Sequence, residues 1–199
     1  MAAIARSRAE LAAARERRRR ELSEDRNDHR MIVSALGISG DDHEELDLKH
    51  NEARLLYRHC GNLAQEVCRI CFGAAFPGSG PRRIPNPVEG ASPKTYEIDW
   101  LAPTREAIEF KWRDATTDGD HVRKERSRLA AIRLRGYVPV RLMLFEPDRE
   151  GARKIQAALE WAYEAAGGVY LAGKEAFGFV HRRTGIDLAS CFREAEAGL

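Results

Sequence analysis

The chain has 199 residues, of which 43% are hydrophobic and 32% charged, and its formal net charge at pH 7 is +2. That composition excludes a disordered or fibrous protein, and the length suffices for one substantial core, with or without a helical appendage. No apolar run reaches the roughly 18 residues that span a bilayer, and the N-terminus lacks the apolar segment of a secretory signal. We therefore expect a cytoplasmic protein, without membrane association, whose four cysteines are reduced.

Residues 3–36 predict a helical arm, because they are rich in Ala, Leu, Glu and Arg and contain no Gly or Pro. The arginine run at residues 17–20 is either a solvated helix face balanced by nearby acids or an arm that contacts phosphates or a partner. Apolar positions are sparse, so this helix needs another surface, such as a second subunit. Gly37 and Gly40 break the chain, and we expect an N-terminal helical arm over residues 1–40 and one compact domain over residues 41–199.

From residue 41 to about residue 72, apolar residues recur at helical spacing, and Gly61 is expected to divide or kink this region. Cys68 and Cys71 invite a metal or redox interpretation. No second Cys/His pair follows at zinc-ligand spacing, so we interpret them as buried helix residues.

Residues 77–93 are rich in proline and glycine and predict a long loop that carries Arg82 and Arg83. A loop of this length is either functional or a simple tether, and the two arginines suit contacts with DNA.

The stretch KTYEIDWLAPTREAIEFKWR, residues 94–113, predicts a β-hairpin. Apolar and polar residues alternate on both arms, as on strands with one buried face, and Pro103 lies in the connecting turn. The expected hairpin brings Asp99 to the same end of the sheet as Glu109 and Lys111. Two acids and a lysine on an apolar ribbon are costly to desolvate unless a cation or a substrate compensates them.

A basic helix over residues 121–135 and the apolar strand VPVRLMLF, residues 138–145, follow the hairpin. A helix between two neighbouring strands is typical of a parallel crossover connection. A further helix to about residue 166, a short strand at residues 169–172 and two C-terminal helices complete the chain. We therefore predict an α/β fold with a mixed central sheet, a catalytic hairpin, flanking helices and a helix-rich N-terminal part.

Asp99, nine intervening residues and the triplet Glu109-Phe110-Lys111 resemble the active-site signature of the PD-(D/E)XK nuclease superfamily. The continuation KWRDATTDGDH, residues 111–121, resembles type II restriction endonucleases of the ApaLI type. Ile98 stands where the superfamily's name has proline.

This resemblance implies a restriction-endonuclease-like fold and a Mg²⁺-dependent, sequence-specific endonuclease that cuts double-stranded DNA to 5′-phosphate and 3′-hydroxyl ends. It implies Asp99, Glu109 and the Phe110 carbonyl as metal ligands and Lys111 as a catalytic residue. An acid on the preceding helix is also expected to assist, with Glu66 as the best match.

Glu52 is the alternative for that helical acid. For DNA contacts we single out six residues by their charge and position: Arg82, Arg83, Arg113, His121, Arg123 and Lys124. No small-molecule cofactor beyond the metal is expected.

Two chains forming a homodimer would most simply cut both strands of a palindrome, because the symmetry of the dimer matches that of the site. The alternatives are a structure-specific or repair nuclease of the same superfamily, or a DNA-binding protein without catalysis. In that last case the Glu109–Lys111 pair is only a surface salt bridge, which contributes little.

Overall fold

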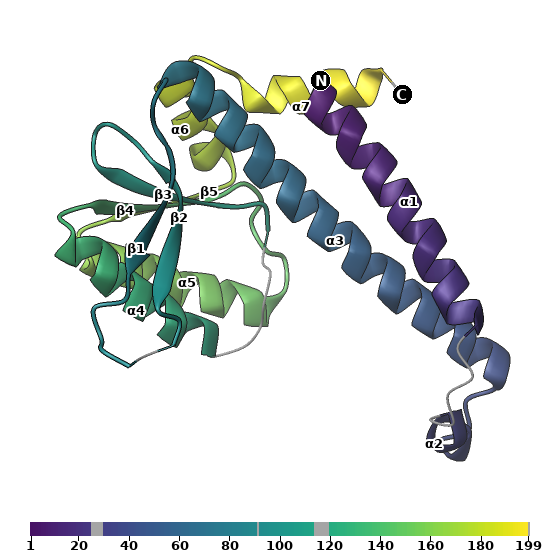
Figure 1. Ribbon diagram of the computed structural model, residues 1–199. Coiled ribbons are helices and arrows are strands. Elements are labelled where there is room, and N and C mark those ends of the chain that lie inside the picture. Colours follow the sequence, from purple (N-terminus) through teal and green to yellow (C-terminus); the bar gives the residue numbers. More distant parts are fainter. Residues whose placement is uncertain (25–29, 91, 114–119, 199) are drawn as a thin grey trace. The chain divides into compact units, whose positions relative to one another are not determined.

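The computed structural model describes residues 1–24, 30–90, 92–113 and 120–198 and divides into two compact units, Met1–Leu63 and Ala64–Leu199. The first unit is helical, and the second contains a five-stranded sheet with flanking helices (Figure 1). Among the described residues, no helix combines the length and apolarity needed to cross a membrane.

The first unit contains α1 (Ala2–Glu24), α2 (Arg30–Ala35) and the first part of α3 (Gly40–Ala75). Ser39 is the N-cap of α3, because its Oγ accepts a hydrogen bond from the backbone N–H of Asp42 at 3.1 Å. The prediction of a helical N-terminal part is confirmed. The expected break at Gly61 is wrong, since α3 is one helix; a single helical glycine costs only about 1 kcal/mol, which good helix formers on either side offset.

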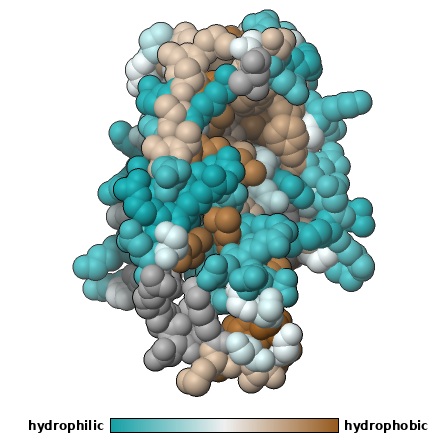
Figure 2. All heavy atoms as spheres, turned by 90° about the vertical axis from the view of Figure 1, so that its right-hand side faces the viewer, coloured by the Kyte–Doolittle hydropathy of each residue, from teal (hydrophilic) through white to brown (hydrophobic). Residues whose placement is uncertain are grey.

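Ion pairs join α1 to α3 within this unit. Glu52 of α3 accepts from Arg19 at 2.7 Å and from Arg15 at 3.1 Å. Most of α1 is exposed, and the face that carries α1 and α2 in Figure 2 is largely hydrophilic with separate hydrophobic spots. The arginine-rich part of α1 therefore serves at least partly as a helix-pairing surface.

The sheet has the strand order β1-β2-β3-β4-β5. β1, β2 and β3 are antiparallel, whereas β3, β4 and β5 are parallel. Their bounds are Gly80–Pro85, Thr95–Leu101, Glu106–Lys111, Val138–Met143 and Val169–Ala172. The helices of this unit, besides the end of α3, are α4 (Asp120–Leu134), α5 (Glu150–Ala165), α6 (Lys174–Thr184) and α7 (Leu188–Ala197). The predicted fold class is confirmed, including the hairpin and the crossover that α4 forms.

Helices cover both faces of the sheet. On one face, the end of α3 packs with α6 and α7 through a cluster that includes Phe72, Trp100 and Ile108. On the other face, α4 and α5 pack through residues such as Ile132 and Leu129. Cys68 and Cys71 are buried in the first cluster, which confirms their interpretation as core residues.

The predicted loop at residues 77–93 is partly wrong, because residues 80–85 form β1. β1 is an edge strand, where a proline can sit without breaking a ladder on both sides. Arg82 and Arg83 therefore project from a strand that pairs with β2, opposite Ile98 and Glu97.

β2 contains a β-bulge at Asp99 and Trp100. Gly80 pairs with Leu101 and Arg82 with Ile98, so two residues of β2 oppose one residue of β1. A bulge shifts the alternation of faces. Ile98 accordingly packs on the α4 side, whereas Trp100 packs against Phe72 on the α3 side, and the expected regular alternation along this strand is wrong.

Gly168, between α5 and β5, tests the packing of the parallel strands. A Cβ atom there would lie 2.3 Å from the Pro139 carbonyl oxygen and 2.6 Å from Pro139 Cγ, whereas a Cβ at Gly151 of α5 meets nothing within 4 Å. We expect Gly168→Ala to lower the free energy of unfolding by about 1–3 kcal/mol, because the added methyl group overpacks this place. Gly151→Ala is the control and should be neutral or slightly stabilising. Urea unfolding measures both, and equal stabilities would contradict this packing.

Candidate active site

The hairpin β2–β3 separates at the residues that carry the candidate chemistry. Its ladder pairs Trp100 with Ile108 and Leu101 with Ala107 and then ends. In the same register Asp99 would face Glu109. Instead of a ladder bond, the Asp99 Oδ2 atom accepts the Phe110 backbone N–H at 3.0 Å. The carboxylate therefore sits between the two strands, close to both of their backbones.

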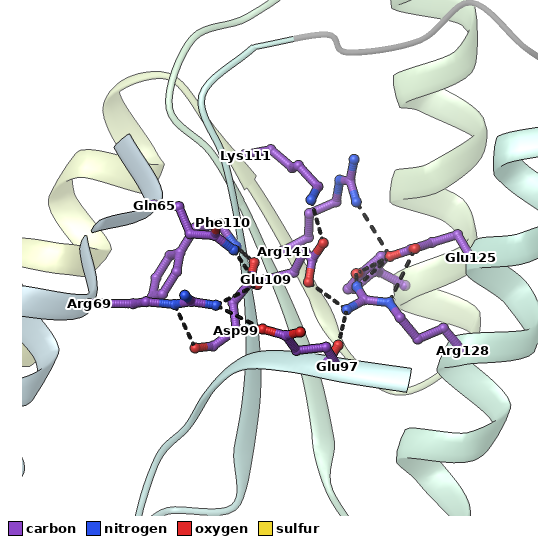
Figure 3. A network of polar contacts seen from close by, with 11 residues as sticks. Gln65, Arg69, Glu97, Asp99, Glu109, Phe110, Lys111, Glu125, Arg128 and Arg141 are labelled. Carbon is purple, nitrogen blue, oxygen red and sulfur yellow. Dashed lines mark hydrogen bonds and ion pairs between the residues drawn. The ribbon is translucent and has the colours of Figure 1, made fainter. Parts of the chain in front are cut away.

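The second half of α3 holds Asp99 from one side (Figure 3). Gln65 donates to Asp99 Oδ1, and Arg69 Nη2 lies 3.3 Å from the same oxygen. Arg69 also contacts Glu97 at 3.2 Å. Asp99 is only 5% exposed, so these donors replace most of the water that a carboxylate would otherwise bind.

Glu109 and Lys111 share a face of β3, as the two-residue spacing predicts. Lys111 Nζ lies 2.5 Å from Glu109 Oε1. Glu109 is only 8% exposed, so this is not the weak surface salt bridge of the alternative interpretation.

Behind Glu109, a buried network reaches from β3 through α4 to α5 (Figure 3). Arg128 of α4 donates to Glu109 Oε2 and, at 2.6 Å, to Glu125 Oε1. Tyr163 of α5 donates to Glu125 at 2.6 Å and accepts from Arg128 at 2.8 Å. Arg141 of β4 lies 3.3 Å from Glu125. Charged groups at this depth persist only when paired and hydrogen-bonded, and here they are.

The two candidate ligands differ in their protonation behaviour. Burial and, to a smaller extent, the adjacent Glu109 carboxylate raise the pKa of Asp99 to about 6, against the opposing effects of Lys111 and the Phe110 N–H. Burial would also raise the pKa of Glu109, but Arg128 and Lys111 outweigh it and hold that pKa below its usual range. The Glu109 carboxylate is thus close enough to Asp99 to raise the pKa of Asp99.

These groups fit a hard divalent cation. Two adjacent carboxylates, one of them reluctant to ionise, favour a positive charge between them. The Phe110 carbonyl adds a third oxygen, because N–H and C=O of one strand residue point to the same side and the Phe110 N–H points at Asp99. Oxygen donors of this kind suit Mg²⁺. Among the described residues no three His, Cys, Asp or Glu side chains converge on one position that could hold a metal ion.

The helical acid predicted to assist stays a prediction. Glu66 is half-buried on α3 directly after Gln65, and it is Gln65 that contacts Asp99. The alternative, Glu52, pairs with Arg15 and Arg19 in the first unit, and the Arg15 and Arg19 hydrogen bonds lower its pKa despite an opposing desolvation effect.

The residues predicted to contact DNA lie on different elements. Arg82 and Arg83 are exposed on β1, and Arg123 and Lys124 are exposed near the start of α4. Arg113 is half-buried just after β3, 3.9 Å from Asp148. The side chain of His121 lies outside the described residues.

Sequence reasoning missed Gln65, Arg69 and the buried network around Arg128. One signal was present: Arg141 interrupts the otherwise apolar run VPVRLMLF, and a charge inside a buried strand implies a buried partner. Arg128 gave no such signal, because four other Lys or Arg residues surround it in the sequence of α4.

Asp99 should give the metal-free protein a pH-dependent stability. Its pKa is about 6 in the folded chain against an ordinary value of 3.8, so the folded chain retains a proton that the unfolded chain loses. This stabilisation is fully present below about pH 4 and is lost as the pH rises through about 6, a loss approaching about 3 kcal/mol. Asp99→Asn lacks the titrating group. In EDTA, urea unfolding from about pH 4 to pH 7.5 should show wild type losing stability relative to this variant. A constant difference across that range would contradict the assignment.

The sequence matches the family of ApaLI-like restriction endonucleases over residues 2–196 of the 199. Comparisons with curated proteins and with solved structures found no match. The family match extends over nearly the whole chain, well beyond the hairpin and the residues just after it, and it confirms the resemblance to restriction endonucleases of the ApaLI type. The chain belongs to the ApaLI-like restriction endonuclease family.

Proposed function

We propose that this protein is a Mg²⁺-dependent type II restriction endonuclease of the PD-(D/E)XK superfamily, which hydrolyses a specific sequence in double-stranded DNA to 5′-phosphate and 3′-hydroxyl ends. The observation that carries the proposal is the buried, adjacent pair Asp99 and Glu109 beside Lys111, at the point where β2 and β3 separate. Membership of a restriction endonuclease family supports the same substrate class.

Asp99, Glu109 and the Phe110 carbonyl are the proposed ligands of the metal. Bound Mg²⁺ would neutralise charge on the scissile phosphate and lower the pKa of a bound water. The chain's own contribution is positional: Gln65, Arg69 and the Phe110 N–H fix the Asp99 carboxylate, so little reorganisation is needed when the substrate arrives.

Lys111 supplies the positive charge nearest to these ligands. Its side chain is 29% exposed, so its ammonium group can reach a phosphate at the surface of the site. There it would donate hydrogen bonds to the attacking water and to a phosphate oxygen. Water attacks phosphorus and loses a proton to solvent, the bond from phosphorus to the 3′ oxygen breaks, and the departing oxygen is protonated by solvent.

Basic residues outside the site are proposed to hold the DNA. Arg82 and Arg83 on β1 and Arg123 and Lys124 on α4 are exposed, as phosphate-contacting groups must be. Arg113 and His121 belong to the same proposal, since Arg113 follows β3 directly and His121 lies at the start of α4.

Lys111→Ala tests the catalytic assignment. The substrate is a DNA long enough to contain most short recognition sequences. With Mg²⁺ we expect wild type to cut it into discrete fragments, and EDTA should abolish the cleavage. Lys111→Ala should cut at least about 100-fold more slowly, because a donor to the reacting groups is gone. Lys154→Ala is the matched control, since Lys154 is an exposed lysine paired with Glu150 on α5.

The pattern of products separates the alternatives. A smear, or cleavage confined to branched DNA, would favour a nuclease without restriction specificity. A gel shift without any cleavage by wild type would leave only a DNA-binding protein.

We also propose a homodimer, because each chain offers one site and a double-strand cut needs two. The N-terminal helical unit is the proposed contact surface. On α2 and just after it, Met31 is 75%, Ile32 70% and Leu36 75% exposed, an arrangement that favours burial against a partner.

Replacing Met31 and Ile32 by aspartate should therefore yield monomers that nick DNA but no longer cut both strands together. Sedimentation with cleavable DNA, and with Ca²⁺ in place of Mg²⁺, measures whether the protein is a monomer or a dimer on DNA. The ratio of nicked to linear plasmid measures whether one strand or both strands are cut. A wild type that remains monomeric on its DNA would contradict the dimer.

A further inference from the structure

The two oxygens of Glu109 have different cationic partners. Oε1 lies beside Lys111, and Oε2 accepts from Arg128. Each oxygen keeps a second lone pair, but an ion that approaches either one meets a cationic group already beside it, so we expect one of the two partners to move when an ion binds. Which of them yields decides how Glu109 can act.

Arg128 is fixed in place. Its side chain is 10% exposed, and five hydrogen bonds use its Nε, Nη1 and Nη2 atoms. The acceptors are both oxygens of Glu125, the Tyr163 hydroxyl, Glu109 Oε2 and the Glu97 carbonyl. A guanidinium has five N–H donors, so the side chain cannot rotate without losing several bonds in a buried site.

Lys111 is held far less firmly. It lies at the end of β3, its side chain is nearly three times as exposed as that of Arg128, and its ammonium is a point charge on a flexible stem. Moving the Lys111 ammonium into solvent or onto a phosphate breaks one partly exposed ion pair. Moving Arg128 would remove a buried cationic partner from Glu109 and from Glu125 at the same time.

Stability does not explain the network around Arg128. Buried ion pairs are often no more stabilising than apolar residues of equal volume, and this one places several charged groups where α4 and α5 could pack with leucine. What the network does provide is a fixed orientation for one carboxylate. Outer groups that orient metal ligands typically change metal affinity 10- to 100-fold when they are altered.

We propose that Arg128, itself held by Glu125 and Tyr163, is a positioning residue that keeps a fixed cation beside Glu109 Oε2 and so directs the metal to Oε1, whose partner Lys111 can move. The ion and Lys111 then compete for the same oxygen. Metal binding releases the Lys111 ammonium for the substrate phosphate. This inference rests on the proposed function, because it takes Glu109 as a metal ligand.

Two variants separate the role of Arg128 from that of Lys111. Tyr163→Phe removes the hydroxyl that bonds Arg128 and Glu125, loosens Arg128, and should raise the Kd for Mg²⁺ about tenfold or more. Lys111→Met removes the competitor for Oε1 and should bind Mg²⁺ at least as tightly as wild type while failing to cut. Calorimetric titration of Mg²⁺ without DNA measures both, so the readout does not depend on catalysis.

Tyr170→Phe is the matched control. Tyr170 lies on β5, and its hydroxyl donates to Gln156 at 3.0 Å, whereas the five acceptors of Arg128 do not include it. This variant should keep wild-type Mg²⁺ affinity. In cleavage assays Tyr163→Phe should lower kcat with little change in the KM for DNA, because the side chain is fully buried and cannot touch DNA.

Circular dichroism and urea unfolding establish that each variant is folded. Should Tyr163→Phe not fold, Arg128→Lys replaces it, since lysine keeps the charge but cannot bridge Glu109 and Glu125 with a fork of donors. Weaker Mg²⁺ binding by the folded variant supports the proposal. Binding equal to that of Tyr170→Phe overturns it, as does markedly weaker binding by Lys111→Met. A wild type that neither binds Mg²⁺ nor cuts DNA would instead overturn the proposed function.

Discussion

One hydrogen bond decides the geometry of the candidate site: the Phe110 N–H donates to the side chain of Asp99 and not to a carbonyl of β2. The ladder between β2 and β3 stops there, and the bulge at Asp99 and Trp100 bends β2 at the same place. In a hairpin with complete pairing, backbone hydrogen bonds would join the two strands at this place. Here the two carboxylates lie there instead, and their mutual repulsion favours a cation between them.

The two sides of the sheet contribute differently to this site. The end of α3 supplies Gln65 and Arg69, which hold Asp99 with few buried charges. The opposite side supplies Arg128 and Glu125, which hold Glu109 through a dense ionic network. Asp99 therefore remains easily protonated while Glu109 remains ionised, so two chemically similar residues are prepared for unequal tasks.

Local patterns in the sequence were sufficient to predict much of this structure. Alternation and turn residues predicted the hairpin, and the helix with its following apolar strand predicted the parallel crossover, because these signals lie within a few residues of each other. β1 was missed because residues 80–85 contain two prolines and pair with a strand ten or more residues away, which no local pattern reveals. The bulge was missed for the same reason.

The site was only half predictable. Asp99, Glu109 and Lys111 carry a recognisable spacing, but the residues that hold them do not. Gln65 and Arg69 look like any polar residues on a helix, and Arg128 looks like one of many surface arginines on α4. Their roles depend on burial, which arises only when α3 and α4 pack against opposite faces of the sheet. Arg141, a single arginine inside the apolar strand β4, was the one sequence signal that indicated the network.

The charges drawn in Figure 3 also have a consequence for how ligands assemble. Among the residues labelled there, Arg69, Lys111, Arg128 and Arg141 balance Glu97, Asp99, Glu109 and Glu125 one for one when Asp99 is ionised. A divalent ion that binds here would give this neutral group of residues a net positive charge, which a polyanion such as DNA would compensate. Ion and nucleic acid would then recruit each other with equal strength, as thermodynamic reciprocity demands. A divalent ion would then bind the complex with DNA more tightly than it binds the protein alone.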